Sequence, residues 1–168
     1  MANRYWVGGA STWNTTSTTN WSTTSGGTGG ASVPTAADSV FFDQAGTYTV
    51  TCTGALTCLD FTVSAGTVSF INGTTPTFAI SGSMSLLAGT VWSSTGAITF
   101  NATTTGKTIT TNGVSITGAI IFNGVGGGWT LASALTSTTV TFTNGTFSTG
   151  NYNCTNTLRF ECCINSIL

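Results

Sequence analysis

A short unit recurs along the chain at a spacing near 21 residues. Gly-Ala followed by alternating apolar residues opens at Gly54, Gly96 and Gly118, so the intervals are two steps of 21 residues and one of 22. Phenylalanines fall at a similar spacing, at positions 61, 78, 100, 122, 142 and 160. A loose repeat near 20 residues is typical of a solenoid, in which each coil buries its apolar face against the next. The repeat therefore favours a single-stranded β-solenoid similar to a right-handed β-helix.

Apolar residues alternate with threonine in and around these copies. Tyr48, Val50 and Cys52 are each separated by a threonine, and Ile98 and Phe100 flank another. Such period-two spacing, with β-branched threonine at the intervening positions, predicts half-buried strands. No window has the apolar period of an amphipathic helix, so we expect an all-β protein.

The segment 38–160 has room for about six coils of this length. Four Asn-Gly dipeptides mark turns in it, because both residue types tolerate a positive φ; they begin at positions 72, 112, 123 and 144. The same residues leave an alternative open. Asn-Gly also favours two-residue hairpins, and short, regularly spaced strands suit an antiparallel β-sandwich or jelly roll.

The N-terminal segment 1–37 differs from the rest of the chain because three of the five tryptophans, Trp6, Trp13 and Trp21, lie within its first 21 positions. The first coil of a solenoid has an open end whose backbone groups and core would face water. We therefore interpret the segment as an aromatic cap folded over that end. The alternative is an aromatic platform that binds sugars.

Charge is nearly absent. The chain has three basic residues, four acidic residues and no histidine, for a formal net charge of −1. Three scattered cations cannot track a phosphate backbone, which argues against nucleic-acid binding. No unbroken apolar run is long enough for a membrane-spanning helix. Without histidine, the commonest general base and metal ligand is missing.

The acidic residues are the candidates for hydrolytic chemistry, since a glycosidase needs two carboxylates. They are Asp38, Asp43, Asp60 and Glu161. Asp38 precedes an apolar strand and Asp43 follows it, and both are positions where aspartate usually serves a turn. We expect structural roles for them, no catalytic residue, no cofactor and no metal site; calcium would require more carboxylates at close spacing.

Five cysteines are present, at 52, 58, 154, 162 and 163. Their spacing does not fit the paired cysteines of a zinc site. Cys52 and Cys58 fall in apolar strand patterns, and we expect them to be small core residues.

The N-terminal motif resembles an opening shared by two groups of proteins: autotransporter-type β-solenoid proteins of bacterial surfaces, and fibre- or adhesin-like virion proteins encoded by phages. It consists of Trp-Val-Gly-Gly at 6–9, Trp-Asn at 13–14, Asn-Trp-Ser at 20–22 and Val-Pro-Thr-Ala-Ala-Asp-Ser-Val-Phe-Phe-Asp at 33–43. The resemblance implies a β-solenoid with a display or structural role and carries over no catalytic residue. The motif residues we single out are Trp6, Trp13, Trp21, Pro34, Asp38, Phe41 and Asp43.

The sequence enters this motif at Trp6, five residues after Met1, without the apolar segment of a secretion signal. We therefore expect a non-enzymatic structural protein of a tailed phage particle, assembled in the host cytoplasm. It would be a tail fibre or tailspike-type adhesin, or a capsid decoration (head fibre) subunit. Expected partners are other virion proteins and a host cell-surface glycan. The alternatives are a secreted adhesin on a bacterial surface and, with less support, a polysaccharide-degrading tailspike.

The C-terminal tail, residues 161–168, is more apolar and less rich in threonine. Either the tail folds over the last coil, or its apolar side chains Ile164, Ile167 and Leu168 bury against a neighbouring subunit. We expect the second arrangement, because an exposed apolar cluster usually marks a contact. Virion spikes are commonly trimers, so the expected assembly is a homotrimer.

Overall fold

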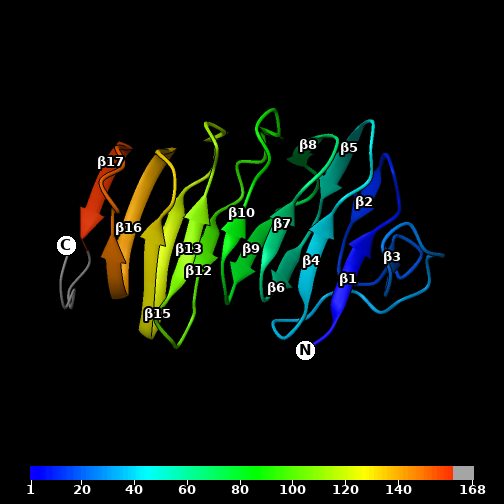
Figure 1. The fold of residues 1–168 in the computed structure, drawn as a ribbon, viewed down its shortest axis with the longest axis horizontal. Coiled ribbons are helices and arrows are strands. Elements are labelled where there is room, and N and C mark those ends of the chain that lie inside the picture. Colours follow the sequence, from blue (N-terminus) through cyan, green and yellow to red (C-terminus); the bar gives the residue numbers. More distant parts are fainter. Residues whose placement is uncertain (161–168) are drawn as a thin grey trace.

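The chain winds into a parallel β-solenoid of about six turns (Figure 1). The structure, a computed structural model, describes the backbone of residues 1–160 and the side-chain environments of residues 1–157. Its 17 strands form one continuous sheet, and 15 of the 16 strand pairings are parallel. The described part of the chain contains no helix. The predicted all-β solenoid is therefore confirmed, and the antiparallel sandwich is wrong.

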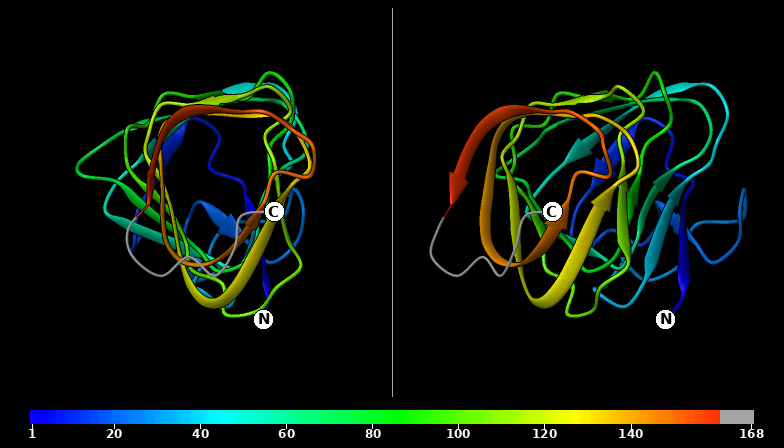
Figure 2. Two further views of the ribbon diagram at one scale, coloured as in Figure 1. Left: turned by 90° about the vertical axis from the view of Figure 1, so that its left-hand side faces the viewer. Right: turned by 60° about the vertical axis from the view of Figure 1, so that its left-hand side comes forward.

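Three β-faces surround the core, as the end-on view in Figure 2 shows. Face A consists of β1 (Asn3–Trp6), β4 (Ser39–Phe42), β7 (Phe61–Val63), β10 (Met84–Ser85), β13 (Lys107–Thr110) and the end of β15 (Ile120–Leu131). Face B consists of β2 (Ser11–Trp13), β5 (Thr47–Cys52), β8 (Thr67–Asn72), β11 (Val91–Trp92), β14 (Ser115–Ile116) and the starts of β16 (Leu135–Ser148) and β17 (Cys154–Phe160). Face C consists of β6 (Ala55–Cys58), β9 (Thr77–Ile80), β12 (Ile98–Phe100), the start of β15 and later parts of β16 and β17.

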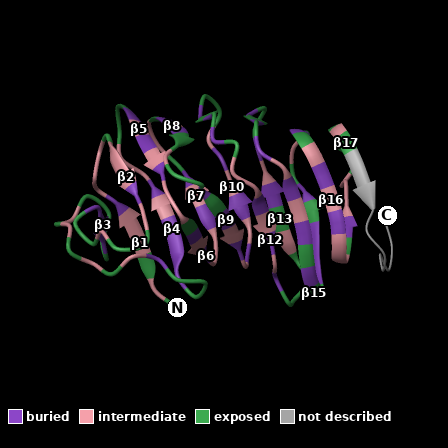
Figure 3. Ribbon diagram, turned by 180° about the vertical axis from the view of Figure 1, so that it is seen from behind, coloured by how far each residue is buried: buried purple, intermediate pink, exposed green. Residues whose placement is uncertain are grey.

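The repeated Gly-Ala unit is the strand of face C. In the copies at 96 and 118, Ile98 pairs with Ile120 and Phe100 with Phe122, so equivalent residues lie directly above one another. The inward columns of this face are Leu56, Phe78, Ile98, Ile120 and Val140, and Cys58, Ile80, Phe100, Phe122 and Phe142. Alternate positions are buried, which gives the banding visible in Figure 3. The sequence spacing thus reflects one coil per repeat.

Phenylalanine spacing indicates the coil length correctly but mixes positions on different faces. Phe100, Phe122 and Phe142 form a true column, and their rings stack at 5.3 and 5.1 Å with interplanar angles of 14° and 8°. Phe61 belongs to face A, and Phe78 pairs with Ile98 rather than with Phe100. Each aromatic pair adds about 0.5–1.5 kcal/mol beyond its area burial, so the aligned column stabilises the C-terminal coils.

The first coil is closed by an antiparallel turn. Strands β1 and β2 pair in parallel with β4 and β5, as in later coils, but β3 (Trp21–Ser22) pairs antiparallel with β1. Trp6, Trp13 and Trp21 are 0–2% exposed, and Trp21 meets the other two edge-on at 5.2 and 5.3 Å. The segment 1–37 therefore contributes both strands of the first coil and a cover of its end.

Glycine and asparagine residues of the motif allow the chain to form this antiparallel turn. A Cβ atom at Gly8 would lie 2.7 Å from the side-chain oxygen of Asn20, so only glycine leaves room for that amide. The Asn20 amide donates to the Thr12 carbonyl at 2.8 Å, and the Trp6 indole donates to the Gly9 carbonyl at 3.0 Å. The Trp-x-Gly-Gly and Asn-Trp elements of the motif thus act together in one turn.

An inward column of face B ends in a polar residue, which leads to a stability prediction. Val50, Phe70, Trp92 and Ile116 are followed in register by Ser137, which is 9% exposed. Its hydroxyl has no hydrogen-bond partner among the described residues. We expect Ser137→Val to raise the free energy of unfolding by about 1–2 kcal/mol, because it removes an unsatisfied buried hydroxyl and adds apolar burial.

Urea unfolding monitored by circular dichroism measures this change. Thr136→Val, at the exposed neighbouring position, is the matched control and should change the free energy of unfolding by less than about 0.5 kcal/mol. A loss of stability in Ser137→Val with no change in the control would mean that the site is too tight for the added methyl groups.

Candidate binding surface

The motif residues lie around the N-terminal end, and most of them are buried. The three tryptophans are in the core and present no ring face to solvent. Pro34 is also buried and lines a hollow of about 200 Å³ beside Trp13. Phe41 points outward and stacks on Tyr5 at 5.0 Å with an interplanar angle of 21°. These contacts join the first two coils, so the motif is brought together as a structural end of the solenoid.

Asp38 holds the start of the first coil. Its carboxylate accepts hydrogen bonds from the Ala2 amide at 3.1 Å and from the Thr35 amide and hydroxyl at 3.1 and 2.8 Å. Burial alone would raise the pKa of Asp38, but the bonds from Thr35, the charge of Arg4 and the bond from Ala2 outweigh it and hold the pKa below its usual value. The charged form is therefore the one that the fold favours.

This gives a pH-dependent prediction. A carboxyl group whose pKa is lowered on folding stabilises the fold above its unfolded pKa of about 3.9, and the contribution is lost as the pH falls through the folded value. We expect Asp38→Asn to lower the free energy of unfolding by about 1–3 kcal/mol at pH 7, because the amide nitrogen cannot accept these bonds. The difference from the wild type should shrink below about pH 4.

Urea unfolding at pH 7, 5 and 3 measures the effect. Asp43→Asn is the control, since among the described side chains Asp43 accepts a hydrogen bond only from its neighbour Gln44. If the free energy of unfolding of Asp38→Asn stays below that of the wild type by the same amount down to pH 3, the result would contradict a role for the charge of Asp38.

Asp60 connects three successive coils, a role that the sequence did not reveal. Its carboxylate accepts from the Ser39 hydroxyl at 3.0 Å and from the Ser83 amide at 2.8 Å. A Cβ atom at Gly82 would lie 2.2 Å from the same carboxylate, so glycine is required beside it. Asp38 and Asp60 are thus both engaged with backbone and hydroxyl donors. Four of the hollows on the described part of the chain have linings without a carboxylate.

The described cysteines are free thiols. Cys52 and Cys58 are buried in the core, as the sequence predicted, and burial raises the pKa of Cys52 to about 12 and that of Cys58 further still. Both remain protonated at neutral pH and are poor nucleophiles. Within residues 1–160, no three His, Cys, Asp or Glu side chains gather as metal ligands would. Cys162, Cys163, Glu161 and the expected contact residues Ile164, Ile167 and Leu168 lie outside the described residues.

The outer side of face B carries a hydroxyl array that the sequence pattern does not single out. Side chains alternate across a strand, so from the second coil onward the segments of β5, β8, β11, β14, β16 and β17 each contribute two outward positions at this face. Ten of the twelve positions are threonine or serine, and none is charged. We call this surface the hydroxyl face. Its first column is Thr49, Ser69, Val91, Ser115, Thr136 and Thr155, and the next outward residues along the same segments are Thr51, Ile71, Ser93, Thr117, Thr138 and Thr157, with a register shift between β16 and β17 after Thr136.

The hydroxyl face is most accessible from β11 onward, where all eight of these positions are exposed. A hollow of about 460 Å³ lies between the β11 and β14 segments. Its lining includes the outward residues Val91, Ser93 and Ser115, and Val91 is 45% exposed. The Thr117 hydroxyl, also in the lining, donates toward the Trp92 and Ser94 carbonyls at 3.0 and 2.8 Å, which leaves its oxygen able to accept.

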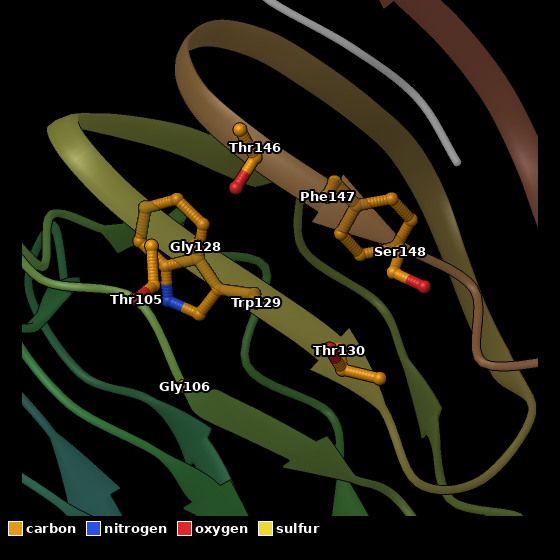
Figure 4. A pocket seen from close by; sticks show the side chains of 8 residues that line it. All are labelled: Thr105, Gly106, Gly128, Trp129, Thr130, Thr146, Phe147 and Ser148. Carbon is orange, nitrogen blue, oxygen red and sulfur yellow. The ribbon is translucent and has the colours of Figure 1, made fainter.

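A second pair of hollows lies at the corner between faces C and A. One, of about 130 Å³, is lined by Trp129 together with hydroxyl residues of neighbouring coils, and the indole nitrogen lies on the side of Thr105 (Figure 4). The other, of about 380 Å³, adjoins it at Thr105 and Thr146. A Cβ atom at Gly127 or Gly145 would lie 2.7 Å from the Trp129 ring, so these glycines make room for the indole. The corner is therefore explained by core packing.

The geometry defines the class of protein as a parallel β-solenoid with an almost uncharged surface and a closed N-terminal end. Among the described residues, no helix is long and apolar enough to cross a membrane. Comparison of the chain with family models, with curated proteins and with solved structures gives no match.

Proposed function

We propose that the chain is a non-enzymatic structural subunit of a tailed phage particle with a mechanical and adhesive role. The observation that carries this proposal is the architecture itself: about six stacked coils with few charges. The motif residues of the N-terminal end, which resemble those of phage fibre- or adhesin-like proteins, add to it. A tail fibre or tailspike-type adhesin and a capsid decoration subunit are the two positions that suit such a rod.

The mechanical part follows from the hydrogen-bond direction. Parallel rungs about 4.8 Å apart make a stack of six coils roughly 30 Å long, with every rung bonded to its neighbours along the axis. The adhesive part follows from the surface. Hydroxyls and amides bind glycans weakly at each site, and many copies on one particle multiply the weak affinity. A homotrimer would add both stiffness and copy number.

Mass spectrometry of purified virions tests the proposal. We expect peptides of this chain in density-gradient-purified particles at a stoichiometry similar to other minor structural proteins. Absence from particles of a phage that expresses the chain would overturn it. Native mass spectrometry of the purified chain tests the trimer, and a strictly monomeric protein at micromolar concentration would remove that part.

The same motif supports one alternative, a secreted β-solenoid adhesin on a bacterial surface. Peptides released by protease shaving of intact bacteria, and missing from particles, would favour it. A depolymerase would show itself differently: cleavage of a host polysaccharide that is lost in Asp38→Asn or Asp43→Asn while folding survives.

A further inference from the structure

We propose that the hydroxyl face binds a neutral glycan chain and that the hollow between β11 and β14 is its central subsite. The inference rests on the adhesive role proposed above and assigns it to one surface. The chemical class follows from three properties of this surface: its regular hydroxyls, its hollow with an apolar wall and outward hydroxyls, and its lack of charge.

The regular hydroxyls set the shape of the occupant. Rungs lie about 4.8 Å apart, and outward residues on one strand lie about 6.6 Å apart, so the face is a two-dimensional grid of donors and acceptors. Each hydroxyl can donate one hydrogen bond and accept two. A polymer that presents hydroxyl and ring oxygens at regular intervals, as a polysaccharide does, can bond to several rungs at once.

The hollow provides a place where one sugar unit can be held from more than one side. It combines the exposed apolar surface of Val91 with the hydroxyls of Ser93 and Ser115. Small-ligand sites typically combine an apolar wall with a few polar groups in this way, and their volumes are usually about 300–1,000 Å³. The hollow, at about 460 Å³, falls within that range.

The wall of the hollow continues into the core. The Trp92 ring contacts Phe61, Phe70 and Phe78 on the inner side of face B, and both the Thr90 hydroxyl and the Trp92 indole nitrogen are buried. The polar groups that an occupant can reach are therefore the outward hydroxyls of the lining, which favour an oxygen-rich occupant over an apolar one.

Charge decides between neutral and anionic glycans. No residue of the hydroxyl face or of the hollow is charged. An anionic sugar would lose hydration on this surface without gaining a cationic partner. The other two faces are less uniform: face A carries Phe41 at an outward position, and face C carries Ala79 and Ile121.

Binding to a printed oligosaccharide array, with the labelled protein coupled to beads for multivalency, tests the inference. The array carries neutral glucans, galactans and N-acetylhexosamine oligomers, and anionic hyaluronan, polysialic acid and heparin. We expect binding to at least one neutral class and none to the anionic ones. The double variant Ser93→Leu/Ser115→Leu should weaken that binding by about tenfold, because it removes two bonding hydroxyls and fills the hollow.

The matched control is Thr108→Leu/Thr130→Leu, which changes two exposed, paired residues on face A in the same way. Its glycan affinity should stay within about twofold of the wild-type affinity. Both double variants should have melting temperatures close to that of the wild type. The inference is overturned if no neutral glycan binds, if only anionic glycans bind, or if both double variants lose binding equally. Virion mass spectrometry is independent of this result, so a particle protein that binds no glycan would refute the subsite and leave the structural role standing.

Discussion

Deletion of residues 97–118 is expected to leave a folded solenoid that is one coil shorter. The cut joins Gly96 to Ala119, so the copy of the repeat at 118 takes the place of the copy at 96. It removes β12, β13 and β14, one strand from each face. Because Phe78 pairs with Ile98 and Ile98 pairs with Ile120, β9 can then pair with the start of β15 in an unchanged register.

The physical reason is that a solenoid is stabilised by contacts between neighbouring coils, so removal of one unit subtracts one set of contacts without disrupting the others. Far-ultraviolet circular dichroism should keep its β-sheet spectrum, and thermal unfolding should stay cooperative at a moderately lower midpoint.

Deletion of residues 97–107 is the matched control. It removes half a coil, which places strands of one face opposite strands of another and brings polar residues to inward positions. This shorter deletion should unfold the chain, as measured by loss of the cooperative transition. If the two deletions behave alike, the 22-residue unit is not the element of stability.

Truncation of Trp13 is expected to destabilise the protein strongly. Its ring contacts Trp21, Phe42, Phe61 and Phe78, with centroid distances of 5.3–6.2 Å, and the side chain is 2% exposed. Trp13→Ala should therefore lower the free energy of unfolding by about 3–5 kcal/mol, the usual cost of replacing a buried aromatic residue with alanine.

The loss should reach beyond the first coil, because the four contacted rings belong to β3, β4, β7 and β9. Urea unfolding followed by tryptophan fluorescence and by circular dichroism measures it. Tyr152→Ala provides the control. Because Tyr152 is 45% exposed, this substitution should lower the free energy of unfolding by less than about 1 kcal/mol. A Trp13→Ala protein as stable as this control would show that the aromatic cluster does not hold the coils together.

The coil length and fold class could be predicted because face C repeats its strand almost unchanged. Gly96-Ala97-Ile98 and Gly118-Ala119-Ile120 are identical tripeptides, and that local pattern is visible without knowledge of the other faces. Faces A and B have strands as short as two residues, such as β10 and β11, which carry too little periodicity to reveal their register. For this reason, spacing alone places Phe61 and Phe78 in the wrong column.

The surface proposed to bind glycans was hidden by the same difficulty. Ser69, Val91 and Ser115 are neighbours in space but lie far apart in sequence, and only the pairing of their strands aligns them. The role of Asp60 across three coils was hidden as well, because its partners Ser39 and Ser83 belong to the preceding and following coils. In contrast, Asp38 and Thr35 are close in sequence, and a turn role for Asp38 could be predicted locally.

The axial direction of the backbone hydrogen bonds has a mechanical consequence. Tension applied between the two ends of the solenoid acts on all rungs in series. The coil with the weakest contacts to its neighbours therefore unfolds at a lower force than the other coils. Each opened coil of about 20 residues releases roughly 70 Å of extended chain. Such a tether would lengthen in steps and absorb shock while its remaining coils stay folded.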